Sequence, residues 1–545
     1  MSKRAAGILG VLWIAACGDT TATSATGAGS TGAASSTGDT TGAPTTGGTS
    51  SGGSTEGGTD SASATGEPTT GSTGTTGGTT SGTTGELTAS SSGGDTTGLD
   101  TTTGDSSGGD SSSTGEPPPV LGPFDVDDLE AGQGHVCAVL HSGELKCWGG
   151  YNDSGDLGLG NTDPYGTTPN TMGNDLPFVD LGAGLLATGV TSYYHGCAVV
   201  TGGKLKCWGQ GTFGALGSGA SDDLGNDPGE MGDKLPFVDL GAGRTVKQVI
   251  NAVWTSCAVL DNDTAKCWGW NGNGWLGLGD KNDRGDQPGE MGDKLPAIDF
   301  GAGRTVQQIA IDNSHACALL DDATIKCWGQ QTEGNLGNGK PGFDAIGDQP
   351  GEMGDKLPVV DLGVGRTAKQ VSLGARHACA LLDNDKVKCW GSNQSGQLGL
   401  GDTNDRGDAP GEMGDALPYV DLGQGRTAVQ VVASYFHSCA ILDDASLKCW
   451  GANSFGALGL GDTNHRGDQP GEMGDALEPI DLGDMRTAIK VVPGANYGCA
   501  LLDNHKVKCW GVGGTQGALG YEDMEHRGDQ PGEMGDALPY VDLGS

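Results

Sequence analysis

The sequence is poor in positive charge and in aromatic residues. It has 30 Lys and Arg residues against 69 Asp and Glu residues, which gives a formal net charge of −39. Clusters of Lys and Arg are what neutralise phosphate groups, so this balance argues against a nucleic-acid partner and against a polybasic membrane anchor. Aromatic residues make up 5% of the chain, whereas glycine accounts for 104 of its 545 residues. One uniform globular domain does not have this composition.

The first seventeen residues have the pattern of an export signal. Lys3 and Arg4 precede an apolar stretch, residues 5–16, that is too short to span a bilayer. The stretch ends in Ile-Ala-Ala-Cys, which resembles a bacterial lipobox, and Cys17 is the odd one of fifteen cysteines. We therefore predict a lipoprotein signal peptide at residues 1–16 and lipidation of Cys17. An ordinary secretory signal is the alternative.

The residue after the lipobox bears on location. Gly18 stands there, rather than an aspartate, so nothing resembles an inner-membrane retention signal. No later segment is long or apolar enough to cross a membrane. We expect an exported protein at the bacterial outer membrane or cell surface, attached to the membrane only through its N-terminal lipid.

Residues 17–119 consist almost entirely of Ser, Thr, Gly and Ala, and contain no Lys, Arg or aromatic residue. Such a segment cannot bury enough apolar surface to offset the entropy lost on ordering. It is predicted to be a disordered tether, with an end-to-end distance of roughly 55 Å for a flexible coil of this length.

From residue 120 onward the chain repeats itself. A segment of Cys-Ala, two aliphatic residues, six further residues and Cys-Trp-Gly occurs seven times, at intervals of 60 or 62 residues. In each copy a polar turn separates two apolar runs, which predicts a β-hairpin. The cysteine pairs are Cys137 and Cys147, Cys197 and Cys207, Cys257 and Cys267, Cys317 and Cys327, Cys379 and Cys389, Cys439 and Cys449, and Cys499 and Cys509.

The ends of the repeat array predict a closed ring. A second strand pattern, Leu-Pro-x-(Val/Ile)-Asp-(Leu/Phe)-Gly, recurs in the units, and a last copy at residues 538–543 follows the seventh hairpin. The first unit has no such segment before it, so we expect the C-terminal strand to join the first blade. Closure of this kind protects sheet edges. The predicted fold is all-β: residues 120–545 form a seven-bladed β-propeller closed by its last strand.

One unit shows a family resemblance. It has Gly374 and His377 before Cys379, the turn Trp390-Gly391-Ser392-Asn393, and the exit Gly396-Gln397-Leu398-Gly399. This resembles a repeat of the regulator of chromosome condensation family, whose members fold as seven-bladed propellers. They include a nuclear nucleotide-exchange factor and secreted bacterial inhibitors of β-lactamase. The exchange activity is not expected in an exported acidic protein. Each unit is also about ten residues longer than the usual repeat, and carries a cysteine pair.

The cysteines and histidines each allow a metal interpretation. Directly opposed strand residues lie within disulfide reach, and the spacing differs from that of zinc sites, so we predict seven intrablade disulfides. Five blades carry a histidine two residues before the first cysteine: His135, His195, His315, His377 and His437. A metal ring is one interpretation. A buried histidine that bonds backbone groups of its own blade is favoured, because Thr255 and Tyr497 replace it elsewhere.

A glycine-rich acidic loop occupies the additional length of each unit. In one copy, Asp402, Asn404, Asp405 and Asp408 offer oxygen ligands of the kind that calcium prefers. Their spacing is not that of an EF-hand, and a solvated acidic loop is the alternative. Calcium is the one cofactor that the sequence suggests.

Aromatic residues gather just before the first cysteine of several blades. The predicted binding face consists of Tyr193, Tyr194, Trp254, Tyr435, Phe436 and Tyr497. A second set follows the Trp-Gly turn: Tyr151, Phe213, Trp270, Trp275 and Phe455. Variable aromatic residues on a constant frame are typical of a recognition surface, with core packing as the alternative.

No recurrent nucleophile, base or carboxylate pair forms a catalytic pattern, so an enzyme is not expected. The sequence predicts a monomeric, non-catalytic binding module for an unidentified protein or glycan. The alternative is a structural surface protein with calcium-binding acidic loops.

Overall fold

The computed structural model describes residues 121–514 and 518–545. The predicted signal peptide, Cys17 and the tether lie outside these residues. Within the described part the regular structure consists of β-strands and short 3-10 helices. No helix there is long and apolar enough to cross a membrane.

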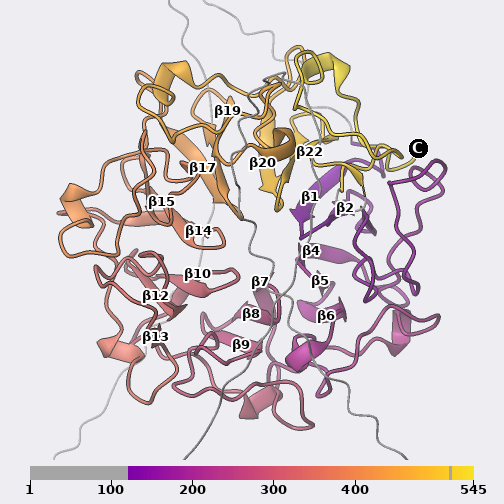
Figure 1. Cartoon of the computed structure of the whole chain (residues 1–545). Helices are drawn as coiled ribbons and strands as arrows, with labels where there is room; N and C mark the ends of the chain where they lie inside the picture. Colours follow the sequence, from indigo (N-terminus) through magenta and orange to yellow (C-terminus); the bar gives the residue numbers. More distant parts are fainter. Residues whose placement is uncertain (1–120, 515–517) are drawn as a thin grey trace, which may run out of the picture. The chain divides into compact units, whose positions relative to one another are not determined.

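Seven antiparallel sheets, called blades 1 to 7 in chain order, follow one another around a centre (Figure 1). Within each blade the strands are hydrogen-bonded in sequence order. Blades 1 to 3 are β1 (Val126–Ala131), β2 (His135–Leu140) and β3 (Leu145–Gly149); β4 (Ala187–Ser192), β5 (His195–Val200) and β6 (Lys204–Gly209); and β7 (Val246–Asn251), β8 (Thr255–Leu260) and β9 (Ala265–Gly269).

Blade 4 has a short fourth strand, and the remaining blades have three strands each. They are β10 (Val306–Ile311), β11 (His315–Leu320), β12 (Ile325–Gln330) and β13 (Ala345–Ile346); β14 (Ala368–Leu373), β15 (His377–Leu382) and β16 (Val387–Gly391); β17 (Ala428–Ala433), β18 (His437–Leu442) and β19 (Leu447–Gly451); and β20 (Ala488–Pro493), β21 (Tyr497–Leu502) and β22 (Val507–Gly511).

The 3-10 helices lie in the loops between blades. They are η1 (Thr212–Gly214), η2 (Gly232–Lys234), η3 (Gly292–Lys294), η4 (Gly354–Lys356), η5 (Gly414–Ala416), η6 (Ser454–Gly456), η7 (Gly474–Ala476) and η9 (Gly535–Ala537).

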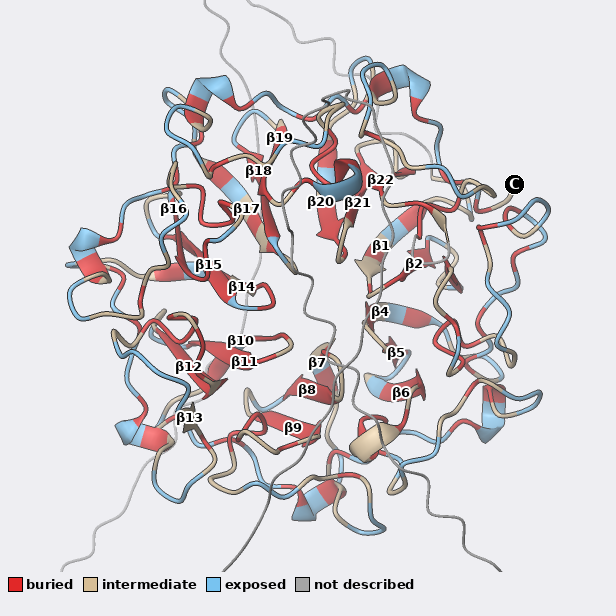
Figure 2. Ribbon diagram, viewed as in Figure 1, coloured by how far each residue is buried: buried red, intermediate tan, exposed pale blue. Residues whose placement is uncertain are grey.

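Every second strand of a blade is buried along its whole length, as β2, β5 and β8 illustrate. Such a strand lies between two neighbouring blades and is covered on both faces, which explains its continuous apolar sequence. Exposed residues gather instead in the loops on the outer side of the ring (Figure 2). The predicted hairpins are therefore the central elements of the core.

The seven predicted cysteine pairs are joined as disulfides across these hairpins. In blade 4, for example, Cys317 lies directly opposite Cys327, with the Cα atoms 4.1 Å apart. Close approach of this kind is typical of the non-hydrogen-bonded pairs of an antiparallel ladder. The other six bridges join Cys137 to Cys147, Cys197 to Cys207, Cys257 to Cys267, Cys379 to Cys389, Cys439 to Cys449, and Cys499 to Cys509. Each bridge links two adjacent strands within one blade, as predicted.

The ring is closed between blades 7 and 1. The innermost strands contact one another in succession all the way round, and β20 contacts β1. One core cluster combines Val126 and Trp148 of blade 1 with Tyr497 and Val507 of blade 7. Like the clusters between other neighbouring blades, this junction combines aliphatic side chains, the disulfide cysteines of one blade and the tryptophan of the next. The residues that the structure describes thus form the predicted seven-bladed propeller.

The pairing of the C-terminal segment differs from the prediction. Val541 donates its backbone N–H to Val507 of β22 at 2.9 Å, whereas Val179 donates to Leu145 of β3 at 2.8 Å. Each Leu-Pro segment therefore runs along the hairpin that precedes it, and residues 538–543 complete blade 7 rather than blade 1. The prediction that they join the first blade is wrong, because residues 176–181 already occupy that edge.

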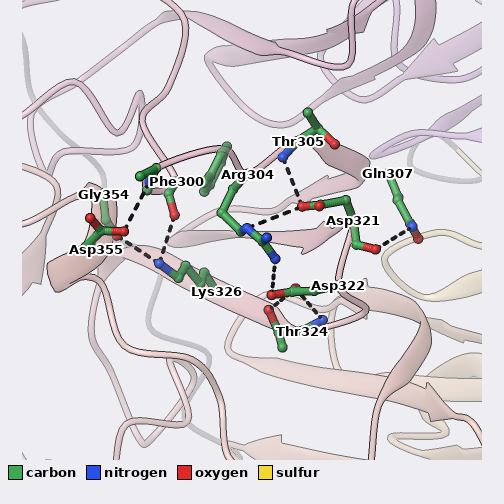
Figure 3. Close-up of polar contacts among 12 residues, drawn as sticks. Phe300, Arg304, Thr305, Gln307, Asp321, Asp322, Thr324, Lys326, Gly354 and Asp355 are labelled. Carbon is green, nitrogen blue, oxygen red and sulfur yellow. Dashed lines mark hydrogen bonds and ion pairs between the residues drawn. The ribbon is translucent and has the colours of Figure 1, made fainter.

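The C-terminal segment nevertheless contacts blade 1 through a lysine. Lys146, whose side chain is buried, donates to the carbonyl oxygens of Leu543 at 2.9 Å and of Gly173 at 2.6 Å. Lys326 of β12 illustrates the same arrangement within the ring (Figure 3). Its Nζ donates to the carbonyls of Phe300, in the Leu-Pro segment of blade 3, and of Gly354 in the next loop. Removal from water lowers the pKa of Lys326.

A buried tryptophan ties each blade to the one before it. The indole Nε1 of Trp268 donates to the carbonyl of Ala215, in the turn that follows blade 2, at 2.9 Å. Trp148 makes the corresponding bond to Ala518 across the closure of the ring, also at 2.9 Å. The seven tryptophans of the Trp-Gly pairs are all fully buried: Trp148, Trp208, Trp268, Trp328, Trp390, Trp450 and Trp510. They therefore belong to the frame and not to the binding face.

Candidate ligand-binding face

Two sets of loops lie side by side on one rim of the propeller. The first connects the inner strand of a blade to its second strand, and the second follows the Trp-Gly pair. In blade 3 the backbone N–H of Trp270 donates to the carbonyl of Trp254 at 2.9 Å, and in blade 6 Ala452 donates to Phe436 at 3.0 Å. Equivalent bonds in other blades hold the two loops together. The two sets of aromatic residues in the sequence therefore share one rim.

A pocket of about 430 Å³ opens on this rim. Its walls contain five aromatic side chains, which come from blades 1, 2, 3 and 6. The lining residues are Gln133, Tyr151, Asp153, Ser154, Asp156, Tyr193, Tyr194, Gln210, Val253, Trp254, Asn313 and Tyr435. The aromatic rim therefore contains a concave site with polar groups at its edge, which is the usual form of a small-ligand or side-chain site.

The tyrosines of the pocket stand at large angles to one another. The ring centroids of Tyr151 and Tyr194 are 5.7 Å apart with their planes 56° apart, and those of Tyr193 and Tyr194 are 5.5 Å apart at 73°. Edge-to-face packing of this kind is favourable for aromatic rings. The rings therefore support one another as the walls of a pocket and do not form one flat surface.

A second aromatic group continues the rim beside the pocket. Trp254 contacts Phe213 at a centroid distance of 5.6 Å and Trp270 at 6.0 Å, and Trp270 contacts Trp275 at 4.7 Å. Trp275 is buried, whereas Trp254 and Trp270 are partly exposed. The aromatic side chains are thus concentrated on blades 1 to 3.

The residue before the histidine position shows how strongly the rim varies. It differs in every blade: Gly134, Tyr194, Trp254, Ser314, Arg376, Phe436 and Asn496. The frame around it carries Cys and Trp-Gly in all seven blades. Each repeat thus combines positions that packing keeps constant with a rim position that varies from blade to blade.

Four of the six residues predicted for the binding face line the pocket: Tyr193, Tyr194, Trp254 and Tyr435. Phe436 is exposed on the same rim and packs on Tyr435, with the ring centroids 4.7 Å apart, but it does not line the pocket.

The prediction for Tyr497 is wrong. Its side chain is fully buried, and its hydroxyl donates to the carbonyls of Gly132 and His135 in blade 1, both at 2.9 Å. It occupies the position that His377 and its equivalents hold in other blades, so its place in the repeat already indicated a frame residue.

Eight of the twelve lining residues lie outside the predicted face, and three of them bear on the chemistry of the site. Tyr151 was assigned only to the second aromatic set, and Asn313 and Asp156 were not singled out. Asp156 carried a signal, because it is the one carboxylate at the variable position of the seven Gly-x-Leu-Gly turns.

One buried acid lines the pocket. Asp156 is 2% exposed, and loss of hydration raises its pKa to about 7. Asp312 lines the cavity between the inner strands rather than this pocket, and its burial also raises its pKa to about 7. Burial raises the pKa of the Tyr194 hydroxyl to about 12. The lining of the pocket contains no Lys or Arg.

Polar side chains line the central channel, a cavity of about 250 Å³ between the inner strands. Glutamine side chains on these strands bond to the backbone of the next blade: Gln248 to Ile309, Gln308 to Val371 and Gln370 to Val431. At the junction of blades 7 and 1, Lys490 instead pairs with Asp128 at 2.8 Å and Glu130 at 2.7 Å. These hydrogen bonds and ion pairs hold neighbouring blades together.

The histidines are part of the frame. His195 and His377 contact the hydroxyls of Ser256 and Ser438 in the next blade through Nε2, at 2.7 and 2.9 Å. Burial lowers the pKa of each to about 3, so both are neutral at ordinary pH. The favoured interpretation expected backbone partners within the same blade, whereas these two use hydroxyls of the neighbouring blade. No group of three or more metal-binding side chains occurs among the described residues.

The predicted calcium ligands contact protein donors. One oxygen of Asp402 pairs with Arg406 at 2.7 Å, and the other accepts the backbone N–H of Asn404 at 2.9 Å. Asp405 accepts the backbone N–H of Asn393 at 2.8 Å. Arg406 also forms an antiparallel bridge with Gly391. These contacts hold the acidic loop against the outer strand of blade 5, and the structure does not gather Asp402, Asn404, Asp405 and Asp408 into a ligand cluster.

Sequence profiles of the regulator of chromosome condensation (RCC1) repeat match this chain at residues 368–397 and 428–457, and a second profile of that repeat matches residues 384–441. The chain contains RCC1 repeats. This confirms the resemblance found in the sequence, and the matched residues fall in blades 5 and 6. The repeat also accounts for the regular return of the Trp-Gly turn.

Two curated relatives share the repeat. The ultraviolet-B receptor UVR8 of Arabidopsis thaliana is 27% identical over 399 residues, which are 72% of this chain and 78% of that protein. The human E3 ubiquitin-protein ligase HERC2 is 28% identical over 281 residues, which are 51% of this chain. The chain spans only 5% of the length of HERC2.

Two solved structures show the same fold. Human WBSCR16 superposes with a TM-score of 0.52 at 16% identity, over 68% of this chain and 85% of that one. Prp20p of Saccharomyces cerevisiae superposes with a TM-score of 0.51 at 18% identity, over 77% of this chain and 87% of that one. Both matches confirm the fold predicted from the repeats.

Proposed function

We propose that this protein is an exported, lipid-anchored and non-catalytic binding module that acts as a monomer. Its propeller recognises a protein or a glycan through the rim pocket, to which blades 1, 2, 3 and 6 contribute aromatic side chains. The observation that carries this proposal is the rim pocket bounded by Tyr151, Tyr194, Trp254 and Tyr435. Partly exposed aromatic side chains in a concave site are the anchors on which binding surfaces most often depend.

The distribution of variation along the repeat supports recognition. The seven blades repeat the same buried contacts, whereas the rim position before the histidine has a different residue in each. A rigid scaffold with variable loops is a common basis of binding. Among the similar proteins, UVR8 is a receptor and Prp20p binds Gsp1p and histones.

The placement of the histidines supports a non-catalytic role. A serine hydroxyl beside a histidine can act as a nucleophile, because the histidine can accept its proton. Here, however, Ser256 and His195 are both buried between blades, and the Ser256 hydroxyl also contacts the carbonyl of Ala215 at 2.9 Å. A substrate therefore has no access to this pair.

Export is supported by the cysteines. Seven disulfides are compatible with an oxidising compartment and unusual in a reducing one. The pattern around Cys17 supplies the anchor. Metabolic labelling with an alkyne fatty acid is expected to label the wild-type protein and to leave Cys17→Ala unlabelled. Equal labelling of both proteins would contradict lipidation at Cys17.

The binding role is tested by affinity capture. The full-length oxidised protein is immobilised and exposed to envelope and culture extracts, beside a double variant that combines Trp254→Ala with Tyr435→Ala. Phe343→Ala is the matched control, because Phe343 is 75% exposed and does not line the pocket. A partner retained by wild type and by the control, but reduced by roughly tenfold or more in the double variant, supports recognition through the rim. Capture that is equal in all three proteins contradicts it.

A further inference from the structure

Asp156 is an unusual residue for its place in the repeat. The other six blades have an uncharged side chain at this position: Ala215, Trp275, Asn335, Gln397, Ala457 and Ala518. The backbone carbonyl of Asp156 performs the frame role, because it accepts the indole N–H of Trp208 at 3.0 Å. A carboxylate is not needed for that bond, so the frame does not explain the side chain.

The carboxylate of Asp156 is buried without a counter-charge. It is 2% exposed and lines the rim pocket. A long hydrogen bond of 3.4 Å from the backbone N–H of Ser154 reaches it, and no ion pair of the described residues includes it. A buried carboxylate is costly unless a cation or several donors compensate it. The described residues supply no cation, and the donors near this carboxylate are the backbone N–H groups of Ser154 and of Asp156 itself.

The walls beside Asp156 suit a cation. Tyr151, Tyr193 and Tyr194 stand at angles of 56° and 73° to their neighbours, and Trp254 and Tyr435 complete the pocket. The faces of Trp and Tyr attract ammonium and guanidinium groups, and several faces around one cavity form a cage for such groups.

The negative charge around the pocket also favours a cationic ligand. Asp153 adds an exposed carboxylate to the lining, and no Lys or Arg belongs to it. The net charge of −39 draws cations toward the molecule and repels anions. Phosphorylated and sulfated ligands are therefore disfavoured at this site.

We propose that the rim pocket binds an organic cation, an ammonium or guanidinium group, with Asp156 as its counter-charge and the aromatic side chains as its cage. This inference rests on the proposed binding function and specifies the chemistry of the ligand. The cation belongs either to a Lys or Arg side chain of a partner or to a methylated ammonium compound. Both sources present the same charge to the same residues.

The test is calorimetric titration of the full-length oxidised protein at constant ionic strength. Choline is the probe for a methylated ammonium, and Nα-acetyl-arginine amide is the probe for a side chain. The neutral control is 3,3-dimethylbutan-1-ol, which has the shape of choline without its charge. We expect saturable binding of one or both cations, with the neutral compound weaker by roughly tenfold or more. The tighter of the two cations identifies the source.

Substitutions assign the binding to Asp156. Asp156→Asn preserves the size of the side chain, and Asn335 occupies the equivalent turn of blade 4, so the fold tolerates the change. This variant is expected to lose roughly tenfold or more in cation affinity, whereas Asp484→Asn, at an exposed position that does not line the pocket, changes it by less than about threefold. The inference is overturned if neither cation binds, if the neutral compound binds as tightly as the better cation, or if Asp156→Asn leaves the cation affinity unchanged.

The outcome is separable from that of the capture experiment. If neither cation binds but a partner is captured in a manner that depends on Trp254 and Tyr435, the cation inference fails and the binding module stands. If the cations bind through Asp156 but the double variant captures the same proteins as wild type, the inference stands and rim-dependent partner recognition fails.

Discussion

Trp268 and Trp254 belong to the same blade and illustrate two different uses of an aromatic side chain. Trp268 is fully buried, and its indole bonds to the preceding blade. Trp254 is partly exposed in the rim pocket and contacts Phe213 and Trp270. The first is repeated in every blade, and the second stands at a position where all seven blades differ. In this blade the repeated tryptophan holds the ring together, and the variable, partly exposed one is available for binding. Variation alone does not mark the binding surface, because Tyr497 departs from the repeat and is nevertheless fully buried.

The largest expected effect comes from replacing Trp268 with alanine, and the same replacement of Trp254 is the comparison. Trp268→Ala opens a cavity between blades and removes a buried hydrogen bond, so the free energy of unfolding should fall by about 3–5 kcal/mol. Trp254→Ala should cost less than about 1 kcal/mol, since its side chain is partly solvated. Denaturant unfolding of the oxidised proteins measures both. Equal losses would show that the rim is part of the frame.

A second comparison concerns Asp156 in blade 1 and its uncharged counterparts. The folded pKa of about 7 lies above the value of about 3.9 for an unfolded aspartate. Between these values the unfolded chain has released a proton that the folded chain retains, so this group makes stability fall as pH rises from about 4 to about 7. Asp156→Asn should therefore be more stable than wild type at pH 8, by roughly 1–4 kcal/mol, and equal to it at pH 4.

Thermal or denaturant unfolding across this pH range checks the prediction. Asp153→Asn is the control, because its carboxylate is exposed and its removal should change stability by less than about 0.5 kcal/mol at either pH. A stability difference between Asp156→Asn and wild type that does not vary with pH would rule out the buried carboxylate as its source.

The third comparison is between the closure of the ring and its internal junctions. Gln248, Gln308 and Gln370 link neighbouring inner strands with neutral hydrogen bonds, whereas Lys490 links blades 7 and 1 through Asp128 and Glu130. These ionic groups are partly exposed, so solvent screens them. Lys490→Met should therefore lower stability by only about 1–2 kcal/mol, mainly because Glu130 loses its partner.

Lys490→Gln is the matched variant for this junction. It introduces the residue that blades 3 to 6 carry at the same position, and should recover part of the loss. Unfolding at low and high salt measures both variants, and the difference between wild type and Lys490→Met should shrink at high salt. A salt-independent difference would indicate lost packing rather than a lost ion pair.

The fold was predictable because the packing that creates it is repeated. The equivalents of Cys317, Cys327 and Trp328 occur at fixed spacing in all seven units. The length of the repeat and the pairing of the cysteines therefore follow from the sequence. The pairing of residues 538–543 was not predictable from a count of strands. Their Leu-Pro pattern fits the outer edge of either adjoining blade, and the backbone contact with Val507 decides between them.

The site was predictable only in part. Tyr193, Tyr194, Trp254 and Tyr435 were found because aromatic side chains in a variable loop are visible in the sequence. Asp156 was missed because its significance depends on burial beside tyrosines from another blade. Tyr497 was misassigned because an aromatic side chain alone does not reveal that its hydroxyl reaches the carbonyls of Gly132 and His135.

The smallest expected effect concerns calcium at the acidic loops. Because Asp402 pairs with Arg406 and accepts the backbone N–H of Asn404, a calcium ion must displace donors that the loop already supplies. A ligand stabilises a protein only in proportion to its binding, so calcium in place of a chelator should shift the melting temperature by less than about 1 °C. Asp402→Ala should lower the melting temperature equally with and without calcium, since it breaks the same internal contacts in both conditions. A rise of several degrees with calcium that Asp402→Ala abolishes would instead make these loops metal sites, and would move them from the frame to the functional surface.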